Sequence, residues 1–212
     1  MKTIEIYYGM SGACKGSTIS AELLKATEQN HPKGVMFSAI KNWKYYQFGL
    51  FKGLTEYNDF SYSILHLVRL REFMERNHET NLDLIVERGI TDSMFYYYHN
   101  GEFKLGTDKG EDVNLISEAV RQEKLLLSPE FHKVEKILLI QNDRNFIKDM
   151  VLQDPYRKRS FNNDPDYYLQ LQNSYVDFTT RYNEIDRVIN IDNARDYIEN
   201  TLGQKFETEY YK

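Results

Sequence analysis

The stretch Tyr7-Tyr8-Gly9-Met10-Ser11-Gly12-Ala13-Cys14-Lys15-Gly16-Ser17-Thr18 is the most informative part of this chain. A short apolar run precedes it and a helical pattern follows it. Phosphate-binding loops have the form G-x-x-x-x-G-K-[ST], in which backbone N–H groups surround phosphate oxygens, the lysine reaches the terminal phosphates and the hydroxyl holds Mg²⁺. Gly9 and Lys15 keep the spacing of that motif. The stretch therefore predicts a phosphate-binding loop between a first strand and a first helix.

Two positions of the motif differ from its usual form. Cys14 stands where the second glycine is expected, so a Cβ atom lies where glycine allows close approach to a phosphate. Gly16 stands in place of the hydroxyl residue, and Ser17 and Thr18 follow one and two positions late. If Ser17 supplies the hydroxyl, the loop must be one residue longer before the helix, an extra turn that Gly16 makes sterically easy. A chance glycine turn and a decayed site without turnover stay open as alternatives.

Length and composition favour one domain spanning residues 1–212, with a mobile lid at about 153–165. The net charge of −5 and the pI of about 5.6 argue against a protein that coats nucleic acid through bulk charge, although a local basic cleft for nucleic acid stays open as an alternative. The single cysteine excludes an intramolecular disulfide. The chain shows neither a charged-then-apolar leader nor an apolar run long enough to span a bilayer, so we expect a soluble, cytoplasmic protein.

Alternating apolar periodicities predict a three-layer α/β sandwich, in which helices cover both faces of a doubly wound parallel sheet of about five strands. Strands are expected at residues 3–8, 34–38, 82–86, 136–141 and 187–192. Helices are expected at residues 17–29 with Ser17 as the cap, 60–76, 91–98, 113–127, 145–151, 166–182 and 194–202. Ligands of such sheets lie at the carboxyl ends of the strands.

Two charged clusters follow predicted elements and suit phosphate chemistry. Glu87-Arg88-Gly89 comes directly after the apolar run of residues 82–86, where a carboxylate can orient Mg²⁺ water or take a proton and a guanidinium can hold a phosphate. Arg157-Lys158-Arg159 lies in the polar segment, where arginines on a closing lid would stabilise a transferring phosphoryl group. The alternatives are an ordinary charged pair at a strand exit and a solvated basic turn.

With these motifs in order, the chain resembles the P-loop nucleoside and nucleoside-monophosphate kinases of the deoxynucleoside kinase and thymidylate kinase group. Residues 9–18 are similar to the phosphate loop of that group. Residues 84–89, followed by Thr91-Asp92-Ser93, are similar to its strand ending in Glu-Arg-Ser or Asp-Arg-Tyr and the Asp-Ser pair that comes next. Arg157 and Arg159 lie where the lid arginines of the group lie. The resemblance covers nearly the full length of the chain.

Two further segments extend the resemblance and complete the site that it implies. Residues 190–193 are similar to the last strand and the loop that touches adenine, and residues 60–71 are similar to the helix that lines the acceptor pocket. The resemblance implies ATP and Mg²⁺ as cofactors, a nucleotide or nucleoside as substrate, and a homodimer formed through helices.

The implied roles fall on residues from the whole length of the chain. The catalytic residues would be Lys15, Glu87, Arg88, Arg157 and Arg159. The nucleotide cofactor would be bound by Gly9, Ser11, Gly12, Ala13, Cys14, Lys15, Gly16, Ser17, Thr18 and Asn193. The acceptor would be bound by Ser38, Trp43, Tyr57, Phe60, Arg69, Arg88 and Asp92. The metal ligands would be Ser17 and Glu87.

The largest departure from the group concerns the choice of acceptor. Deoxynucleoside kinases carry Glu-Pro-Val-x-x-Trp after the second strand, and this chain has Ser38 in place of the glutamate that takes the proton of the sugar hydroxyl, although Trp43 is kept. A phosphate acceptor is already ionised and needs no strong base, which favours a nucleoside monophosphate. A free nucleoside or a modified base within DNA is the alternative, with Glu87 or Asp59 as the base. The identity of the acceptor base stays open, because the base-reading glutamine of the group is absent.

A second hypothesis, from outside the enzymes, is a nucleotide-binding regulator that has lost catalysis. The substitutions Cys14, Gly16 and Ser38 would explain that loss. His66 is expected to be a partly buried polar side chain without a metal role, because no metal-ligand partners stand at suitable spacing and no zinc site is predicted. The regulator would bind nucleotide without turning over any acceptor.

Overall fold

The structure is a computed structural model that describes residues 2–36, 58–99, 113–129, 131–154 and 161–203. Within these ranges the side chains of residues 58–65, 93 and 96–99 lie outside the description. The middle of the expected lid falls in the gap at 155–160.

The centre of the molecule is a five-stranded sheet in which every pair of neighbouring strands is parallel, in the order β2-β3-β1-β4-β5. The strands are β1 (Thr3–Tyr8), β2 (Lys33–Met36), β3 (Asp83–Glu87), β4 (Lys133–Gln141) and β5 (Arg187–Ile191). β1 is central, pairing Tyr7 with Glu87 on one side and Tyr8 with Leu138 on the other. The predicted α/β fold with a parallel sheet of about five strands is confirmed.

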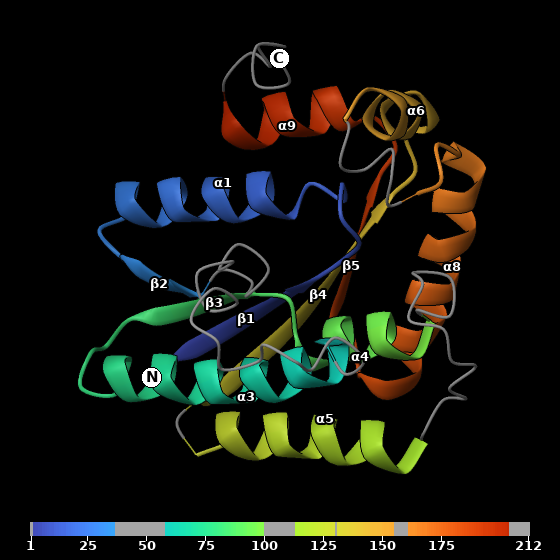
Figure 1. The fold of residues 1–212 in the computed structure, drawn as a ribbon. Helices are drawn as coiled ribbons and strands as arrows, with labels where there is room; N and C mark the ends of the chain where they lie inside the picture. The colour runs from blue at the N-terminus through green and yellow to red at the C-terminus, as the bar shows by residue number, and fades with distance from the viewer. Residues whose placement is uncertain (1, 37–57, 100–112, 130, 155–160, 204–212) are drawn as a thin grey trace.

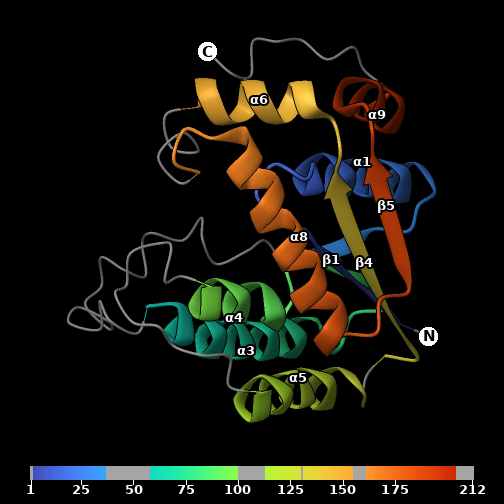
Figure 2. The same ribbon diagram turned by 90° about the vertical axis from the view of Figure 1, so that its right-hand side faces the viewer.

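Helices cover both faces of the sheet (Figure 1). The helices are α1 (Lys15–Glu28), α3 (Asn58–Asn77), α4 (Ile90–His99), α5 (Val113–Leu127), α6 (Arg144–Gln153), α8 (Pro165–Tyr182) and α9 (Ala194–Leu202). α1 and α9 lie on one face, and α3, α4 and α5 lie on the other (Figures 1 and 2). Among the described helices, none combines the length and the apolar character that a bilayer crossing requires.

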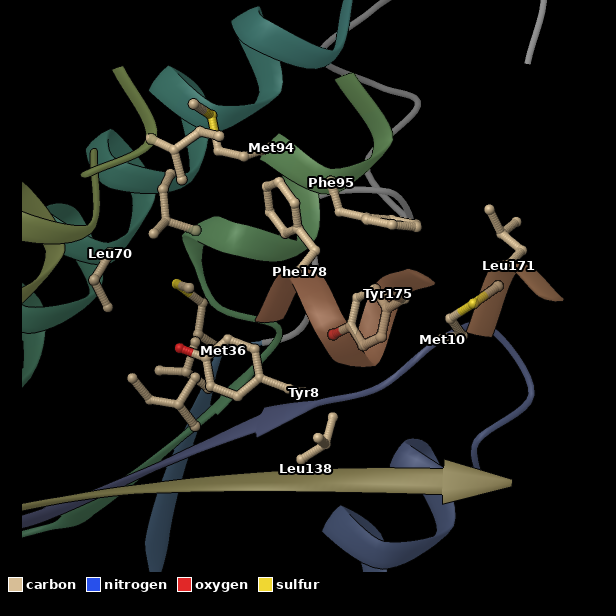
Figure 3. Packing of buried hydrophobic residues seen from close by; sticks show 14 of the residues in the cluster. Tyr8, Met10, Met36, Leu70, Met94, Phe95, Leu138, Leu171, Tyr175 and Phe178 are labelled. Carbon is tan, nitrogen blue, oxygen red and sulfur yellow. The ribbon is translucent and has the colours of Figure 1, made fainter. Parts of the chain in front are cut away.

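Two hydrophobic clusters follow from the period-2 alternation along the strands. Ile4, Ile6 and Tyr8 of β1 face the cluster that contains buried side chains of α3, α4, α5 and α8. Tyr7 faces the other cluster, where Ile19 of α1 packs. Figure 3 shows the first cluster, with aromatic rings from α4 and α8 above the sheet.

Most element boundaries agree with the sequence prediction to within about three residues, and two differences have physical causes. α1 begins at Lys15 instead of residue 17, because Cys14 and not Ser17 occupies the N-cap position. β4 begins at Lys133 instead of residue 136, because pairing with β1 extends the strand through a charged stretch that lacks an apolar pattern.

The chain changes faces between β1 and β3. The helix after β1, α1, covers one face, whereas the helix after β3, α4, covers the other (Figure 1). The chain segments that follow these two adjacent strands therefore run to opposite faces of the sheet. Doubly wound sheets bind their ligands at such a switch point, here called the crevice. The predicted phosphate loop and Arg88 both lie at this crevice.

Candidate active site

The loop between β1 and α1 is a tight turn with three residues at positive φ. Gly9 and Gly12 have φ values of 148° and 91°, and Cys14 has φ 54° and ψ 19°, in the left-handed region. Glycine adopts that region without steric cost, whereas a residue with a Cβ atom is strained there. At the position of the motif's second glycine, the chain thus places a cysteine in a conformation that glycine would adopt at lower cost.

The first turn of α1 presents backbone donors to this loop. The first intrahelical hydrogen bond runs from the amide of Thr18 to the carbonyl of Cys14, at 3.0 Å. The amides of residues 15–17 precede that bond and have no partner within the helix. They lie at the positive end of the helix dipole, which favours an anion. The Ala13 amide, in contrast, donates to the carbonyl of Met10 at 3.1 Å and is already used inside the loop.

The hydroxyl residues of α1 do not take the places that the motif would give them. The longer loop needed for Ser17 is absent, because α1 begins at Lys15 and Ser17 is already its third residue. Thr18 is buried and its hydroxyl contacts the Cys14 carbonyl and the Tyr197 hydroxyl, each at 2.9 Å. At Gly16 a Cβ atom would meet nothing within 4 Å.

Lys15 is a buried cation folded onto the loop. Its side chain is 5% exposed, and its ammonium group donates to the carbonyl of Met10 at 2.8 Å and to that of Gly9. Burial, followed by the charge of Arg88, lowers the pKa of Lys15 to about 7, and the carboxylates of Asp92 and Glu87 oppose this shift. Burial and the neighbouring guanidinium therefore disfavour the charged form of Lys15 in the free protein.

The turn after β3 places Arg88 beside the loop. The amide of Arg88 donates to the carbonyl of Tyr7 at 2.9 Å, and φ of Arg88 is 75°, again in the left-handed region. Asp92, in the first turn of α4, accepts from the Arg88 guanidinium at 3.4 Å and from the Gly89 amide at 3.1 Å. Burial raises the pKa of Asp92, and Arg88 and Lys15 oppose the rise. Asp92, expected to bind the acceptor, is engaged with the protein in this structure.

Gly89 has a packing reason to be glycine. A Cβ atom at this position would lie 2.3 Å from the hydroxyl oxygen of Tyr8 and 2.5 Å from its Cζ. The fully buried Tyr8 ring therefore occupies the space that a serine side chain would need. The departure from the Glu-Arg-Ser pattern follows from the tyrosine in β1.

Three polar side chains from other elements form hydrogen bonds with the backbone of the loop, and they were not predicted from the sequence as part of the site. The Tyr168 hydroxyl donates to the carbonyl of Ser11 at 3.0 Å, and the Tyr175 hydroxyl accepts from the amide of Gly9 at 2.8 Å. The Gln141 side chain donates to the carbonyl of Gly12 at 3.4 Å. Tyr168 and Tyr175 stand two helical turns apart on α8, so the sequence could predict that they share one face of this helix. It could not predict that this face contacts the loop after β1.

The segment expected to touch adenine is tied to two helix starts. Asn193 is the N-cap of α9, and its side chain accepts from the amide of Asp196 at 3.1 Å. The carboxylate of Asp143, the N-cap of α6, accepts from the amide of Phe146 at 3.0 Å and from that of Ala194 at 2.9 Å, so one side chain joins the first turns of α6 and α9. This fixes the position of residues 192–194 relative to β4.

Several predicted residues lie outside the described part of the chain or away from the loop. Ser38, Trp43, Tyr57, Arg157 and Arg159 are outside it, as is the side chain of Phe60. Arg69 lies on α3. His66 is buried and forms a 3.0 Å contact with the buried Glu123, which also accepts from the amide of Ile90.

The metal-binding capacity of the site rests on few side chains. Within the described ranges, no three His, Cys, Asp or Glu residues come together to hold an ion. Mg²⁺ that arrives with a nucleotide needs only one or two protein carboxylates, because phosphate oxygens and water supply its other ligands. Glu87 fits that requirement, since it ends β3 and its charge acts on Lys15.

Comparison with known proteins places the fold. No protein-family profile and no curated protein matches the sequence. A deoxyadenosine kinase from M. mycoides with bound dATP matches with a TM-score of 0.57 and 16% identity, over 96% of each chain. Thymidylate kinases match from Candida albicans (TM-score 0.51, 13% identity, 90% of this chain and 84% of that one) and from Ehrlichia chaffeensis (0.50, 12%, 90% and 92%). At these identities the likeness shows a shared fold, which is the P-loop kinase fold.

Proposed function

We propose that this protein transfers the terminal phosphoryl group of ATP to a nucleoside monophosphate. The observation that carries the proposal is the meeting of Lys15, Arg88 and the first amides of α1 in the crevice between β1 and β3. Structures of nucleoside and nucleotide kinases share this fold over nearly the whole chain. The fold supports the proposal, and the named residues supply its chemistry.

The electrostatics of the crevice favour an anionic ligand. Burial and Arg88 both disfavour the charged form of Lys15. A bound phosphate would reverse this balance, because an opposite charge at short distance favours the ammonium form. The β and γ phosphates of ATP would replace the carbonyls of Gly9 and Met10 as partners of the Lys15 ammonium group.

The remaining roles follow from position. Arg88 would hold the transferring group or the acceptor phosphate through its planar guanidinium, and Asp92 keeps that group in place. Arg157 and Arg159 would approach from the lid, and Asn193 lies at the end expected to hold adenine. Mg²⁺ bound with ATP would neutralise charge on the phosphate oxygens, and Glu87 would be its protein ligand in place of Ser17, which is already the third residue of α1. Because Gly16 replaces the hydroxyl residue that usually binds the metal, Glu87 would be the main protein ligand of Mg²⁺.

The choice of a monophosphate as the acceptor rests on a missing carboxylate. Ser38 replaces the carboxylate that would take a proton from a sugar hydroxyl, so an acceptor that is already ionised suits the site better. Ser38, Trp43, Tyr57, Phe60 and Arg69 would surround that acceptor. A nucleoside, or a modified base within DNA, is the second candidate and requires Glu87 to act as the base.

The test is a transfer assay with labelled ATP and Mg²⁺ against three panels: nucleosides, nucleoside monophosphates, and oligonucleotides carrying modified bases. We expect transfer to a monophosphate, and a loss of about 10²- to 10³-fold in kcat in Lys15→Met. The matched control is Lys25→Met, which removes an exposed lysine from the same helix and should retain full activity.

Three results would contradict the proposal or one of its assigned roles. A protein that ATP stabilises against heat but that phosphorylates none of the three panels is a nucleotide-binding regulator. A protein that ATP neither stabilises nor binds does not use this loop for nucleotide at all. Equal activity in Lys15→Met and the wild type would remove Lys15 from the reaction.

A further inference from the structure

A buried tyrosine joins the two halves of the crevice. Tyr175 projects from α8 and is fully buried, with its ring edge-to-face against Phe95 at 5.2 Å between centroids (Figure 3). Its hydroxyl oxygen accepts from the amide of Gly9 at 2.8 Å, and its hydroxyl hydrogen is donated to the carboxylate of Asp92 at 2.8 Å. One hydroxyl group therefore connects the first residue of the phosphate loop to the first turn of α4.

Asp92 extends this connection to the Arg88 turn. The carboxylate oxygen that receives the Tyr175 hydroxyl is also the one that faces the Arg88 guanidinium, at 3.4 Å. The second oxygen accepts from the amide of Gly89 at 3.1 Å. Asp92 is 1% exposed, so these contacts are made in a medium of low dielectric, where charged hydrogen bonds are strong.

The hydrogen-bond direction makes the arrangement specific. Tyr175 donates its one hydroxyl hydrogen to Asp92, so its oxygen lone pairs stay available to accept from the Gly9 amide. Phenylalanine would fill the same space among Phe95 and Phe178 without linking either partner. Tyr168, on the same face of α8, donates to the loop at a different point, the carbonyl of Ser11, which makes it a matched control.

We propose that Tyr175 is a positioning residue that fixes the phosphate loop relative to the Arg88 guanidinium through Asp92. It touches neither phosphate nor acceptor. It sets the separation between the loop amides with Lys15 on one side and Arg88 on the other, the two groups that must act on the same phosphate. This inference rests on the proposed function for its catalytic meaning, whereas the link itself exists in the free protein.

The link is tested first without any ligand, by amide hydrogen exchange in Tyr175→Phe and Tyr168→Phe. In Tyr175→Phe we expect faster exchange at Gly9, which loses its acceptor, and also at Gly89, whose acceptor Asp92 is released. Tyr168→Phe should leave both amides as protected as in the wild type. Unchanged exchange at Gly89 in Tyr175→Phe, or equal acceleration there in Tyr168→Phe, would overturn the proposal.

The second arm measures function with Mg²⁺-ATP as the probe. Loss of one positioning hydrogen bond should weaken ATP binding about 3- to 10-fold in Tyr175→Phe. With a transferring wild type, kcat at saturating ATP should fall by about 10-fold or more, because misplacing Arg88 affects the reaction itself. A tyrosine that serves stability alone would lower the melting temperature and leave kcat unchanged, which would also overturn the proposal. If the wild type binds no ATP, the proposed function fails, and the exchange arm still decides whether the link exists.

Discussion

Among single residues, Cys14 allows the clearest test of the loop geometry, because its backbone is in the left-handed region, which a side chain with a Cβ atom disfavours. In the left-handed region a Cβ atom costs about 1–2 kcal/mol, and glycine recovers most of this while adding some entropy to the unfolded chain. We therefore expect Cys14→Gly to be more stable than Cys14→Ala by about 0.5–1 kcal/mol in chemical denaturation. Cys14→Gly should also bind ATP more tightly than the wild type, since a phosphate can approach the backbone more closely.

The alanine variant is the control for loss of the thiol. The Gln141 side chain lies 3.6 Å from the sulfur, and both variants lose this contact equally. The difference in stability between Cys14→Gly and Cys14→Ala therefore measures the cost of the left-handed backbone conformation at residue 14. An alanine variant at least as stable as the glycine variant would show that residue 14 does not adopt the left-handed conformation.

Lys15 should give the stability of the protein a recognisable pH dependence. Its pKa is lowered from 10.5 to about 7 by burial. Between these values the unfolded chain holds a proton that the native protein does not, so the free energy of unfolding rises with pH across this window. We expect the melting temperature of the wild type to rise relative to that of Lys15→Met between pH 7 and 10.5. A constant difference between the two proteins over this range would show that Lys15 is not buried in the free state.

At the level of secondary-structure elements, the start of α4 depends on how it packs against β1. Gly89→Ala forces a Cβ atom onto the Tyr8 ring and should destabilise the protein by about 1–3 kcal/mol. In the double variant with Tyr8→Leu this cost should shrink, because the clash is gone, and the two effects should not add. Gly16→Ala is the control, since its side chain meets open space at the exposed start of α1 and should stabilise by about 0.5–1 kcal/mol. Additive costs at Gly89 and Tyr8 would contradict the packing.

Helices and strands could be predicted from the sequence where a local pattern of apolar residues defines them. α5 and α9 were placed from periodicity alone, and the buried strand β3 from its apolar run. The start of α1 was misplaced, because a serine at a suitable position outweighed the loop geometry that in fact ends at Cys14. The loop contacts of Tyr168 and Tyr175 join residues 157 and 166 positions apart, and no local pattern encodes such partners.

For the whole molecule, the order of strands and helices was enough to predict that the loop and the residues after β3 meet at one edge of the sheet, because parallel strands end there together. Glu87, Arg88 and the loop do meet there. The sequence was less informative about which side chains face the ligand and which hold the site together. Asp92 and Thr18 have the residue types of ligand-binding groups, yet in this structure they contact protein groups. The single domain spanning residues 1–212 stays a prediction.

The two faces of the sheet should differ in local stability. Beneath α1 and α9 the described helices contribute aliphatic side chains, chiefly Ile19, Ala194 and Ile198, and Leu24 of α1 is 50% exposed. On the other face α4 and α8 contribute large aromatic side chains such as Phe95 and Phe178. Less apolar area buried per helix means a smaller free energy of local opening. We therefore expect native-state hydrogen exchange under mild denaturant to open α1 and α9 before α8, and Mg²⁺-ATP to slow exchange most in α1, whose first turn would hold the phosphates. Equal opening free energies for α9 and α8 would contradict this asymmetry, and protection by ATP confined to α8 would place the nucleotide elsewhere.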